Sequence, residues 1–200
     1  MAPKPENSPR IRQIRPSEFT RMDEFLYLAI FLPPGAVPPP RTVTSLPELA
    51  IYIRDFGTRP GDHGFVAESN GEIVGMAWAR LIRDFGYIDD ATPSVAISLK
   101  ESWRGKGVGT RLLRALTDEM KSAGFRHASL SVQKENRPAL RLYRKAGFEP
   151  FRETDEEWIM RIHLYQDEAV GSEESGVNPL RATPAPPRAA RRPREPLRRR

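Results

Sequence analysis

Three glycines within five residues impose the tightest constraint on how this chain folds. Gly105, Gly107 and Gly109 occur in the segment R-G-K-G-V-G, which begins at Arg104 and lies between an alternating apolar run and an amphipathic run. Glycine allows the backbone to adopt conformations that other residues resist and to approach a ligand closely. Free N–H groups at a helix start, beside the positive end of the helix dipole, form an anion-binding site. The segment therefore predicts a strand, a glycine-rich turn and a helix whose first amides hold a phosphate group.

The spacing of these glycines separates the loop from two common phosphate-binding motifs. A P-loop requires Gly, four residues and then Gly-Lys-Ser/Thr, and this spacing is absent. A dinucleotide fingerprint requires G-x-G-x-x-G at the first strand of a doubly wound sheet, whereas this G-x-G-x-G lies in the middle of the chain. Nucleotide hydrolysis and dinucleotide binding are therefore disfavoured. A tight turn without a ligand remains the alternative, although Arg104 and Lys106 add positive charge that favours an anion.

Hydrophobic periodicity predicts a mixed α/β fold. Strands are indicated where apolar and polar residues alternate, and helices where apolar residues recur at three- and four-residue spacing. Asn70-Gly71 lies between two apolar runs and predicts a tight hairpin turn. A strand, a helix and a strand over residues 95–132 form a crossover, which predicts one parallel strand pair. The expected strands cover residues 11–15, the two arms of the hairpin within residues 64–82, and residues 95–99, 128–132 and 158–164; the expected helices begin at Pro16, at Ser45 (ending near Gly57), at Val108 and at Asn136.

Composition divides the chain into a central domain and two terminal segments. We expect residues 1–10 to be flexible, residues 11–165 to form the domain, and residues 166–200 to be disordered. The last segment has eight arginines against five acidic residues and few large apolar side chains, so it cannot bury enough surface to offset the entropy of ordering. It lacks an aromatic residue for base stacking, so nucleic-acid binding is disfavoured. A solubilising role is the simpler interpretation, and contact with an acidic partner is the alternative.

Several functional classes are excluded or disfavoured by composition. Cysteine is absent, which excludes disulfides, thiolate metal sites and a cysteine nucleophile. The three histidines are not spaced as metal ligands, so we expect no metal site. No apolar run approaches the roughly 20 residues that a membrane span needs, and the first residues lack the apolar core of a secretion signal. We therefore expect a soluble, cytoplasmic protein with no membrane partner.

Two motifs at a fixed separation resemble those of the GCN5-related N-acetyltransferase (GNAT) family. The segment R-G-K-G-V-G matches the family's R/Q-x-x-G-x-G/A signature, and residues 129–151 are similar to the family's next strand and helix. The resemblance covers about residues 11–165. It implies the GNAT fold, in which a central mixed, mostly antiparallel, twisted sheet splays between two parallel strands and is flanked by helices. The second motif is N-x-x-A-x-x-x-Y-x-x-x-G-F, at Asn136, Ala139, Tyr143, Gly147 and Phe148.

The resemblance also implies that acetyl-CoA is the cofactor, used as a co-substrate, and it implies roles for the matching residues. The glycine loop would hold the pyrophosphate, and the end of the preceding strand, at Ile97 and Leu99, would pair with the pantetheine arm. Asn136 would bond that arm as well, and Tyr143 would be the catalytic acid that protonates the thiolate of departing CoA. A buried aromatic with a satisfied hydroxyl is the alternative interpretation of Tyr143. The loop residues implied as cofactor-binding are Arg104, Gly105, Lys106, Gly107, Val108, Gly109 and Thr110.

The general base is where the chain departs from the family. Ser94 stands about where many relatives place a glutamate. Asp89 and Asp90 lie just upstream and Glu68 lies on the expected hairpin, but each is more simply interpreted as a surface charge. We expect the acceptor to be selected by segments outside the glycine loop, because long loops on a rigid scaffold usually carry specificity. The expected contributors are residues 33–40, 45–57 and 83–92, acidic Asp84, and aromatic Trp78, Phe85 and Tyr87.

These features support two functions. The first is an N-acetyltransferase that moves an acetyl group from acetyl-CoA to a primary amine of a small molecule or peptide, by direct attack in a ternary complex. The second is a catalytically weak acyl-CoA-binding or sensing domain, whose arginine-rich end contacts an acidic partner. A nucleic-acid-binding protein is a more remote hypothesis, and a homodimer is compatible with each.

Overall fold

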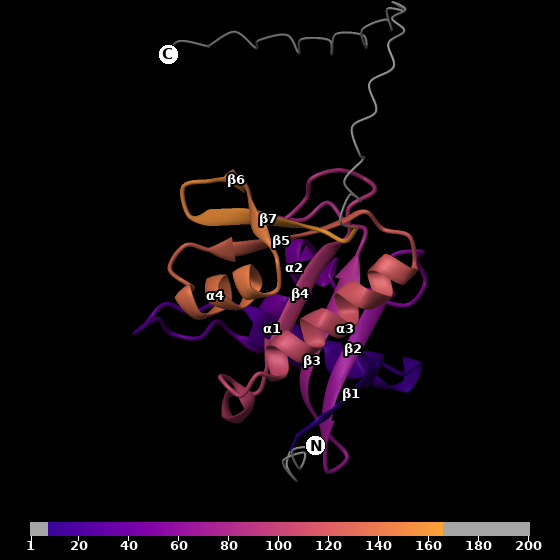
Figure 1. The fold of residues 1–200 in the computed structure, drawn as a ribbon. Helices are drawn as coiled ribbons and strands as arrows, with labels where there is room; N and C mark the ends of the chain where they lie inside the picture. The colour runs from indigo at the N-terminus through magenta and orange to yellow at the C-terminus, as the bar shows by residue number, and fades with distance from the viewer. Residues whose placement is uncertain (1–7, 166–200) are drawn as a thin grey trace, which may run out of the picture. The chain divides into compact units, whose positions relative to one another are not determined.

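One mixed sheet organises the chain, and its strands follow chain order except at one end. The computed structural model describes residues 8–165. In this part, seven strands lie in the order β1-β2-β3-β4-β5-β7-β6, and every neighbouring pair is antiparallel except β4 and β5 (Figure 1). The predicted parallel crossover is therefore confirmed. The strands are β1 (Arg10–Gln13), β2 (His63–Ser69), β3 (Glu72–Arg80), β4 (Ser94–Leu99), β5 (His127–Gln133), β6 (Glu149–Glu153) and β7 (Glu157–His163).

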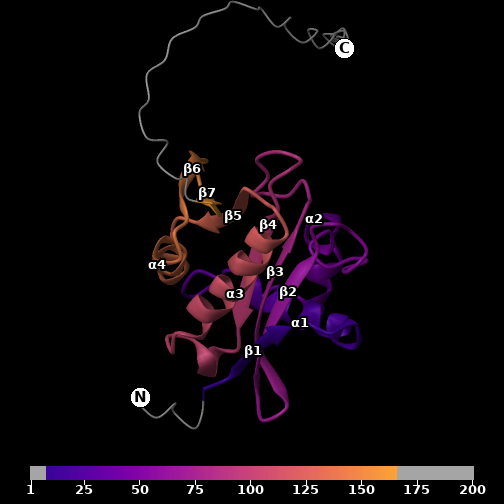
Figure 2. The ribbon, with the colours of Figure 1, turned by 45° about the vertical axis from the view of Figure 1, so that its right-hand side comes forward.

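Helices cover both faces of this sheet. The long helix α3 packs on β2, β3 and β4 and also contacts α4, whereas α1 packs on β3 and β4. Figure 2 shows α3 and α4 on one side of the sheet and α1 and α2 on the other. Two separate clusters of buried apolar side chains fill the two faces. The α-helices are α1 (Met22–Ala29), α2 (Pro47–Ala50), α3 (Val108–Ser122) and α4 (Arg137–Lys145), and the 3₁₀-helices are η1 (Pro16–Arg21), η2 (Arg41–Ser45) and η3 (Glu101–Trp103).

The hairpin between β2 and β3 has the turn that its sequence predicts. Asn70 has a φ of 51° and Gly71 a φ of 78°, and Ser69 pairs with Glu72 directly across the turn. Two positive φ values suit the right-handed twist of a two-residue hairpin, and Asn-Gly tolerates them best. The hairpin sets the register of β2 and β3, which form the middle of the first half of the sheet.

The contact between β4 and β5 is limited to one end of the two strands. Ser94 and Ser129 are the only residues of the pair in register, and the Ser129 N–H donates to the Pro93 carbonyl at 2.9 Å. On its other edge, β5 pairs with β7 at every position from His127 to Gln133. Beyond Ser94, the edge of β4 that faces β5 has no strand partner, and the sheet opens between these two strands.

Side chains of β4 alternate between the two faces, as the period of a strand requires. Val95, Ile97 and Leu99 pack into the cluster under α3, and Ala96 packs against the cluster under α1. The hydroxyl of Ser98 donates to the carbonyl of Phe25 at 2.6 Å, which fastens α1 to the strand. The opening beside β4 is thus bordered by helices on both sides.

The helix expected from Ser45 to near Gly57 is much shorter than predicted. Ser45 belongs to η2, and α2 begins after Leu46 with no side-chain cap. Residues 51–57 continue as turns. Asp55 and Gly57 have φ values of 54° and 87°, which a right-handed helix cannot include. Ala50 and Phe56 of this segment are still buried, but the segment is held by tertiary contacts rather than by a long helix.

A buried arginine supplies those contacts. Arg80 at the end of β3 is 1% exposed, and its Nε donates to Asp62 Oδ1 at 2.7 Å. Its Nη1 donates to the carbonyls of Ile51 and Arg54, and its Nη2 to that of Asp55. One side chain therefore binds the carbonyls that the end of α2 leaves free and fixes this turn against the sheet.

Strand β6 is absent from the sequence prediction. All five of its residues are exposed, and its register with β7 is irregular between Pro150 and Arg152. A strand that buries no side chain has no alternation to detect, so only its pairing with β7 defines it. The last predicted strand, by contrast, corresponds to β7.

The terminal predictions fall mostly outside the described residues. Residues 1–7 and 166–200 are not described, and the expectations of a flexible start and a disordered end stay predictions for them. Within residues 8–10, however, Arg111 donates to the Ser8 hydroxyl and the Pro9 carbonyl, and β1 begins at Arg10. The described domain thus begins before Ile11. Across residues 8–165 no helix combines the length and apolar character needed to cross a membrane.

Replacing Asp62 with alanine is expected to lower the free energy of unfolding by about 3–5 kcal/mol, because it leaves the Arg80 charge buried without its partner. Guanidinium denaturation followed by circular dichroism measures this loss. The matched control is Asp118→Ala, which removes an exposed ion pair with Arg114 and should change the free energy of unfolding by less than about 0.5 kcal/mol. Equal losses in the two variants would contradict the role assigned to Arg80.

Candidate active site

The glycine loop leaves a run of backbone amides without partners. The Arg104 N–H donates to the Glu101 carbonyl at 3.0 Å, and the Arg111 N–H donates to the Gly107 carbonyl at 3.2 Å. Between them, the amides of residues 105–110 donate no hydrogen bond to any atom of residues 8–165. Gly107 is the N-cap of α3, so the last of these amides also lie at the positive end of the helix dipole. This is the geometry that the sequence predicts for an anion site.

The three glycines of the loop have two different physical roles. Gly105 and Gly107 have φ values of 70° and 77°, and a Cβ on either would meet no atom within 4 Å. Glycine is needed there for the backbone conformation. Gly109 lies inside the helix, where a Cβ would lie 3.2 Å from Leu142 and 3.3 Å from Leu99. Glycine is needed there because α3 approaches α4 and β4 closely.

Two cations flank these amides. The Arg104 Nε donates to the Leu99 carbonyl at 3.2 Å, which holds its side chain at the end of β4. The ammonium of Lys106 lies 5.5 Å from the centre of the Trp103 ring. Neither side chain forms an ion pair within the described part of the chain. Both positive charges therefore stay available to a bound anion.

The predicted pantetheine-binding residues line the opening of the sheet. Ile97 and Leu99 lie on the edge of β4 that β5 leaves unpaired, and both are half-buried. Asn136 caps α4, with its Oδ1 accepting from the Ala139 N–H at 3.2 Å. The side-chain N–H₂ of Asn136 donates no hydrogen bond within residues 8–165. The capping role is therefore compatible with a second role in ligand binding.

Tyr143 extends from α4 toward the opening. Its ring is buried and meets Phe148 edge to face at 5.9 Å. Its hydroxyl has no hydrogen-bond partner among residues 8–165, so the interpretation of Tyr143 as an aromatic with a satisfied hydroxyl is not supported. Burial raises the pKa of Tyr143 to about 12. The phenol therefore keeps its proton at neutral pH and can donate it.

A cavity of about 270 Å³ joins Tyr143 to elements on the opposite face of the sheet. Tyr143 belongs to α4, whereas most apolar lining residues come from α1 and the two residues after it, η2, α2 and the loop after β3. The cavity therefore passes through the opening between β4 and β5. The lining residues are Leu26, Ala29, Ile30, Phe31, Val43, Leu49, Tyr52, Phe85, Val95, Ala96, Ile97, Ser131, Gln133, Tyr143 and Glu157.

Glu157 is the acidic residue of this cavity, and sequence reasoning missed it. It is the first residue of β7 and pairs with Gln133 of β5. Its carboxylate accepts hydrogen bonds from the Ser131 hydroxyl and from Gln133 Nε2, the latter at 3.1 Å. Only the pairing of β5 with β7 brings these residues together, so no local sequence pattern signals the group.

A second carboxylate, that of Asp84, accepts a hydrogen bond at each of its two oxygens. The hydroxyls of Tyr52 and Ser94 each donate to it at 2.6 Å. Burial is the largest influence on Asp84 and raises its pKa, whereas the two hydroxyl donors lower it. The pKa of Tyr52 is raised by burial and by the nearby Asp84 charge. Ser94, the position where the resemblance led us to look for a base, thus binds a carboxylate from another segment.

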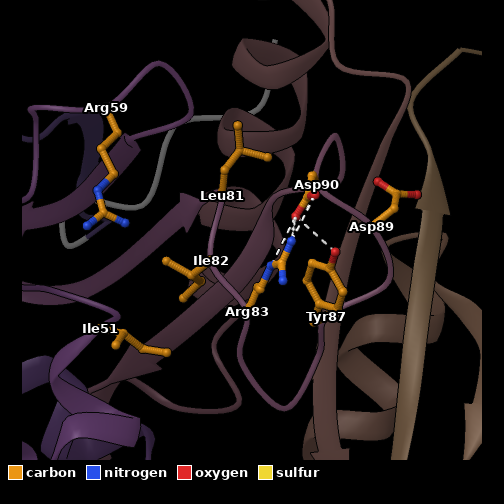
Figure 3. Close-up of a pocket in the computed structure, with 8 residues that line it drawn as sticks. All are labelled: Ile51, Arg59, Leu81, Ile82, Arg83, Tyr87, Asp89 and Asp90. Carbon is orange, nitrogen blue, oxygen red and sulfur yellow. Dashed lines mark hydrogen bonds and ion pairs between the residues drawn. The ribbon is translucent and has the colours of Figure 1, made fainter. Parts of the chain in front are cut away.

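The carboxylates that the sequence suggested as bases lie elsewhere. Asp89 and Asp90 line a separate cavity of about 350 Å³, where Asp90 binds Arg83 and Tyr87 (Figure 3). Glu68 binds Arg12 on β1. None of the three lines the cavity that contains Tyr143. Among residues 8–165, no cluster of three or more His, Asp or Glu side chains has the arrangement of a metal site.

The segments expected to form the acceptor side contribute unequally. Residues 45–57 supply Leu49 and Tyr52, and the loop of residues 83–92 supplies Phe85. A Cβ on Gly86 would lie 2.9 Å from the Leu130 backbone, so this glycine lets the loop lie against β5 and places Phe85 at the cavity. Residues 33–40 do not line the cavity.

The other aromatic residues that the sequence singled out do not line this cavity. Trp78 is buried and donates to the Tyr52 carbonyl at 3.1 Å, and Tyr87 belongs to the separate cavity of Figure 3. Trp78 thus contributes indirectly, because it binds the backbone of Tyr52, which does line the cavity.

Comparison with known proteins finds acetyltransferases, both among family models and among individual relatives. The model of the acetyltransferase (GNAT) family matches residues 30–148, more than half of the chain. The N-alpha-acetyltransferase of Sulfurisphaera tokodaii is 35% identical over 110 residues, which are 52% of this chain and 62% of that protein. The mycothiol acetyltransferase of Thermobifida fusca is 31% identical over 87 residues, which are 42% of this chain and 27% of that protein. The match thus spans less than two thirds of the length of these relatives.

A solved structure has the same fold. The PaiA N-acetyltransferase of Thermoplasma acidophilum, determined with coenzyme A, has a TM-score of 0.60 and 17% sequence identity. The likeness covers 78% of this chain and 99% of that one. The mixed fold with a sheet that splays between two parallel strands is thereby confirmed.

The cap on α4 gives a test of the local structure. Asn136→Ala removes the side-chain acceptor for the Ala139 N–H and is expected to lower the free energy of unfolding by about 1 kcal/mol. Asn136→Asp retains an acceptor and should change it by a few tenths of a kcal/mol. Urea denaturation of both variants measures the difference. An alanine variant as stable as the aspartate variant would show that the cap is dispensable.

Proposed function

Because the chain belongs to the acetyltransferase (GNAT) family, we propose that it transfers an acetyl group from acetyl-CoA to a primary amine. The observation that carries the proposal is the place of Tyr143. Its unbonded hydroxyl lies in a cavity that passes through the sheet, beside the unpaired edge of β4. The free amides of the glycine loop lie beyond the other end of the same strand. Acetyl-CoA bound on the α3 face and an amine bound on the α1 face would meet at this hydroxyl.

The glycine loop fits a diphosphate. The consecutive amides of residues 105–110 are unbonded in the described chain, and Arg104 and Lys106 supply positive charge without acidic partners. A diphosphate placed there would receive several N–H donors at the positive end of a helix dipole. The coenzyme A in the PaiA structure supports this ligand class for the fold.

The pantetheine arm would then follow the edge of β4. Ile97 and Leu99 offer backbone groups that no strand pairs with, and an extended chain can bind such an edge as an added strand does. The free N–H₂ of Asn136 lies at the start of α4 and would donate to the same arm. These contacts direct the thioester end toward the opening.

Acetyl-CoA supplies the acetyl group in activated form, as a thioester. The residues of this chain hold the two reactants in one cavity, and this positioning provides much of the rate of a reaction between two molecules. The Tyr143 phenol, which is protonated at neutral pH, donates to the sulfur as negative charge develops on it. Backbone N–H groups on the unpaired edge of β4 would donate to the carbonyl oxygen.

Replacing Gly107 with valine is expected to weaken coenzyme A binding at least tenfold, because a branched side chain is strained at a φ of 77° and crowds the anion-binding amides. Isothermal titration calorimetry with coenzyme A measures the change. Gly124→Val is a matched control, since Gly124 lies just beyond the other end of α3 with a φ of 89° and equally open surroundings. It should lose stability but keep its coenzyme A affinity; similar affinities in both variants would count against the loop as the site.

Replacing Tyr143 with phenylalanine is expected to lower kcat for thiol release about 100-fold, as loss of a general acid does. The affinity for acetyl-CoA should stay within twofold of the wild type, because the ring and its packing remain. Free-thiol detection across a panel of primary amines measures the rate. Tyr165→Phe removes an exposed hydroxyl that donates to the Lys121 carbonyl and serves as the control. Coenzyme A binding without turnover of any amine would favour the acyl-CoA-binding or sensing domain instead.

A further inference from the structure

Glu157 faces the cavity without a positive partner. Its two hydrogen bonds come from neutral donors, the Ser131 hydroxyl and the Gln133 amide. It forms no ion pair within residues 8–165, and it is half-buried. A carboxylate that is partly removed from water is stabilised by a nearby cation. A cationic group of a bound ligand could therefore form an ion pair with Glu157.

The other carboxylate of this region is not open to a ligand in the same way. Both oxygens of Asp84 accept a hydroxyl, from Tyr52 and from Ser94, at 2.6 Å. Asp84 does not line the cavity, whereas Glu157 lines it together with Tyr143. Of the two acids, Glu157 is therefore the one placed to contact a bound molecule near the reacting atoms.

Most of the other lining residues of the cavity are apolar, and among the polar ones Ser131 and Gln133 already donate to Glu157 and Tyr52 donates to Asp84. The apolar side chains include Ile30, Phe31, Leu49 and Phe85, and Glu157 is the one charged residue of this lining within the described chain. A mostly apolar wall offers few partners to further hydroxyl groups or charges of a ligand, and burying such a group unpaired costs free energy. A ligand with one positive charge on an apolar body matches this lining, whereas polyamines, sugars and carboxylate-bearing amines do not.

We propose that Glu157 binds the ammonium group of the acceptor and takes its proton, and that the acceptor is a primary amine attached to an apolar body. The inference rests on the proposed function, since it assigns the acceptor side of the same cavity. Such a group occurs in free alkyl or arylalkyl amines and at the start of a peptide with an apolar first residue. Ser131 and Gln133 act as positioning residues, because they orient the carboxylate.

The proton and bond changes balance without another reactant. One proton of the ammonium passes to Glu157, which frees the nitrogen lone pair. The new N–C bond then forms as the C–S bond breaks, and the sulfur takes the proton of Tyr143. A second proton leaves the nitrogen and restores the phenol, and Glu157 releases its proton to water.

Binding to the protein saturated with coenzyme A provides the first test. Calorimetry with phenethylamine at pH 7.5, where this amine is cationic, is expected to give an affinity at least tenfold lower for Glu157→Gln than for the wild type. Glu156→Gln, which alters the exposed neighbouring residue, should bind as the wild type does. Equal affinities in the wild type and Glu157→Gln, or no binding of phenethylamine by the wild type at 10 mM, would overturn the inference.

Turnover of different amines by the wild type gives a second test, to which the variant adds a further comparison. Phenethylamine or phenylalanyl-glycinamide is expected to have a kcat/KM at least tenfold above those of spermidine and phenylalanine, and the better of the two shows whether the amine is free or peptide-borne. Glu157→Gln should lower that kcat/KM about 100-fold. A preference for spermidine or phenylalanine would overturn the inference but leave the acetyltransferase proposal intact. Failure of acetyl-CoA to bind would instead overturn the proposed function.

Discussion

The single contact between β4 and β5 determines the architecture of the site. One register pair, Ser94 with Ser129, and one bond from Ser129 to the Pro93 carbonyl join the strands at one end. No other register pair joins β4 to β5, so β4 is left with an unpaired edge beside an opening, whereas β5 pairs with β7 along its other edge. The free amides of the glycine loop, the hydroxyl of Tyr143 and the carboxylate of Glu157 all gain their proposed roles from that opening. A sheet paired fully at this point would separate the two faces.

The parts of the site on the α3 face and on the α1 face are stabilised by different kinds of interaction. On the α3 face, close packing at Gly109 and a cluster of aliphatic side chains hold the loop against β4, so the amides are fixed by the hydrophobic effect and shape. On the α1 face, the wall after α2 has little regular structure of its own. There Arg80 binds three carbonyls and Asp62, and Trp78 binds the Tyr52 carbonyl, so directional polar contacts replace a long helix. The side proposed for acetyl-CoA is therefore built on regular elements, whereas the side proposed for the amine is built partly on turns.

Sequence reasoning succeeded where a residue's role depends on its near neighbours. Gly107 and Asn136 begin their helices, and Asn70-Gly71 forms the hairpin turn, because turn and cap chemistry act over a few residues. It failed where partners are distant. The carboxylate of Glu157 is oriented by Ser131 and Gln133, which lie more than twenty residues away. Where a longer helix was expected after Ser45, the turns after α2 are bound by Arg80, which lies at the end of β3. The roles of the cofactor-binding residues and of Tyr143 stay predictions, although their places in the fold agree with them.

The outer strand β6 bears on how copies of this chain can associate. Pro150 has no N–H to donate, the register beside it is irregular, and Glu149, Arg152 and Glu153 place charge along the exposed edge. Each of these features discourages the addition of another strand. The sheet is therefore closed to growth on this side, which protects the chain from edge-to-edge aggregation. A homodimer, expected as one possibility from the sequence, would be built from surfaces other than the edge of β6.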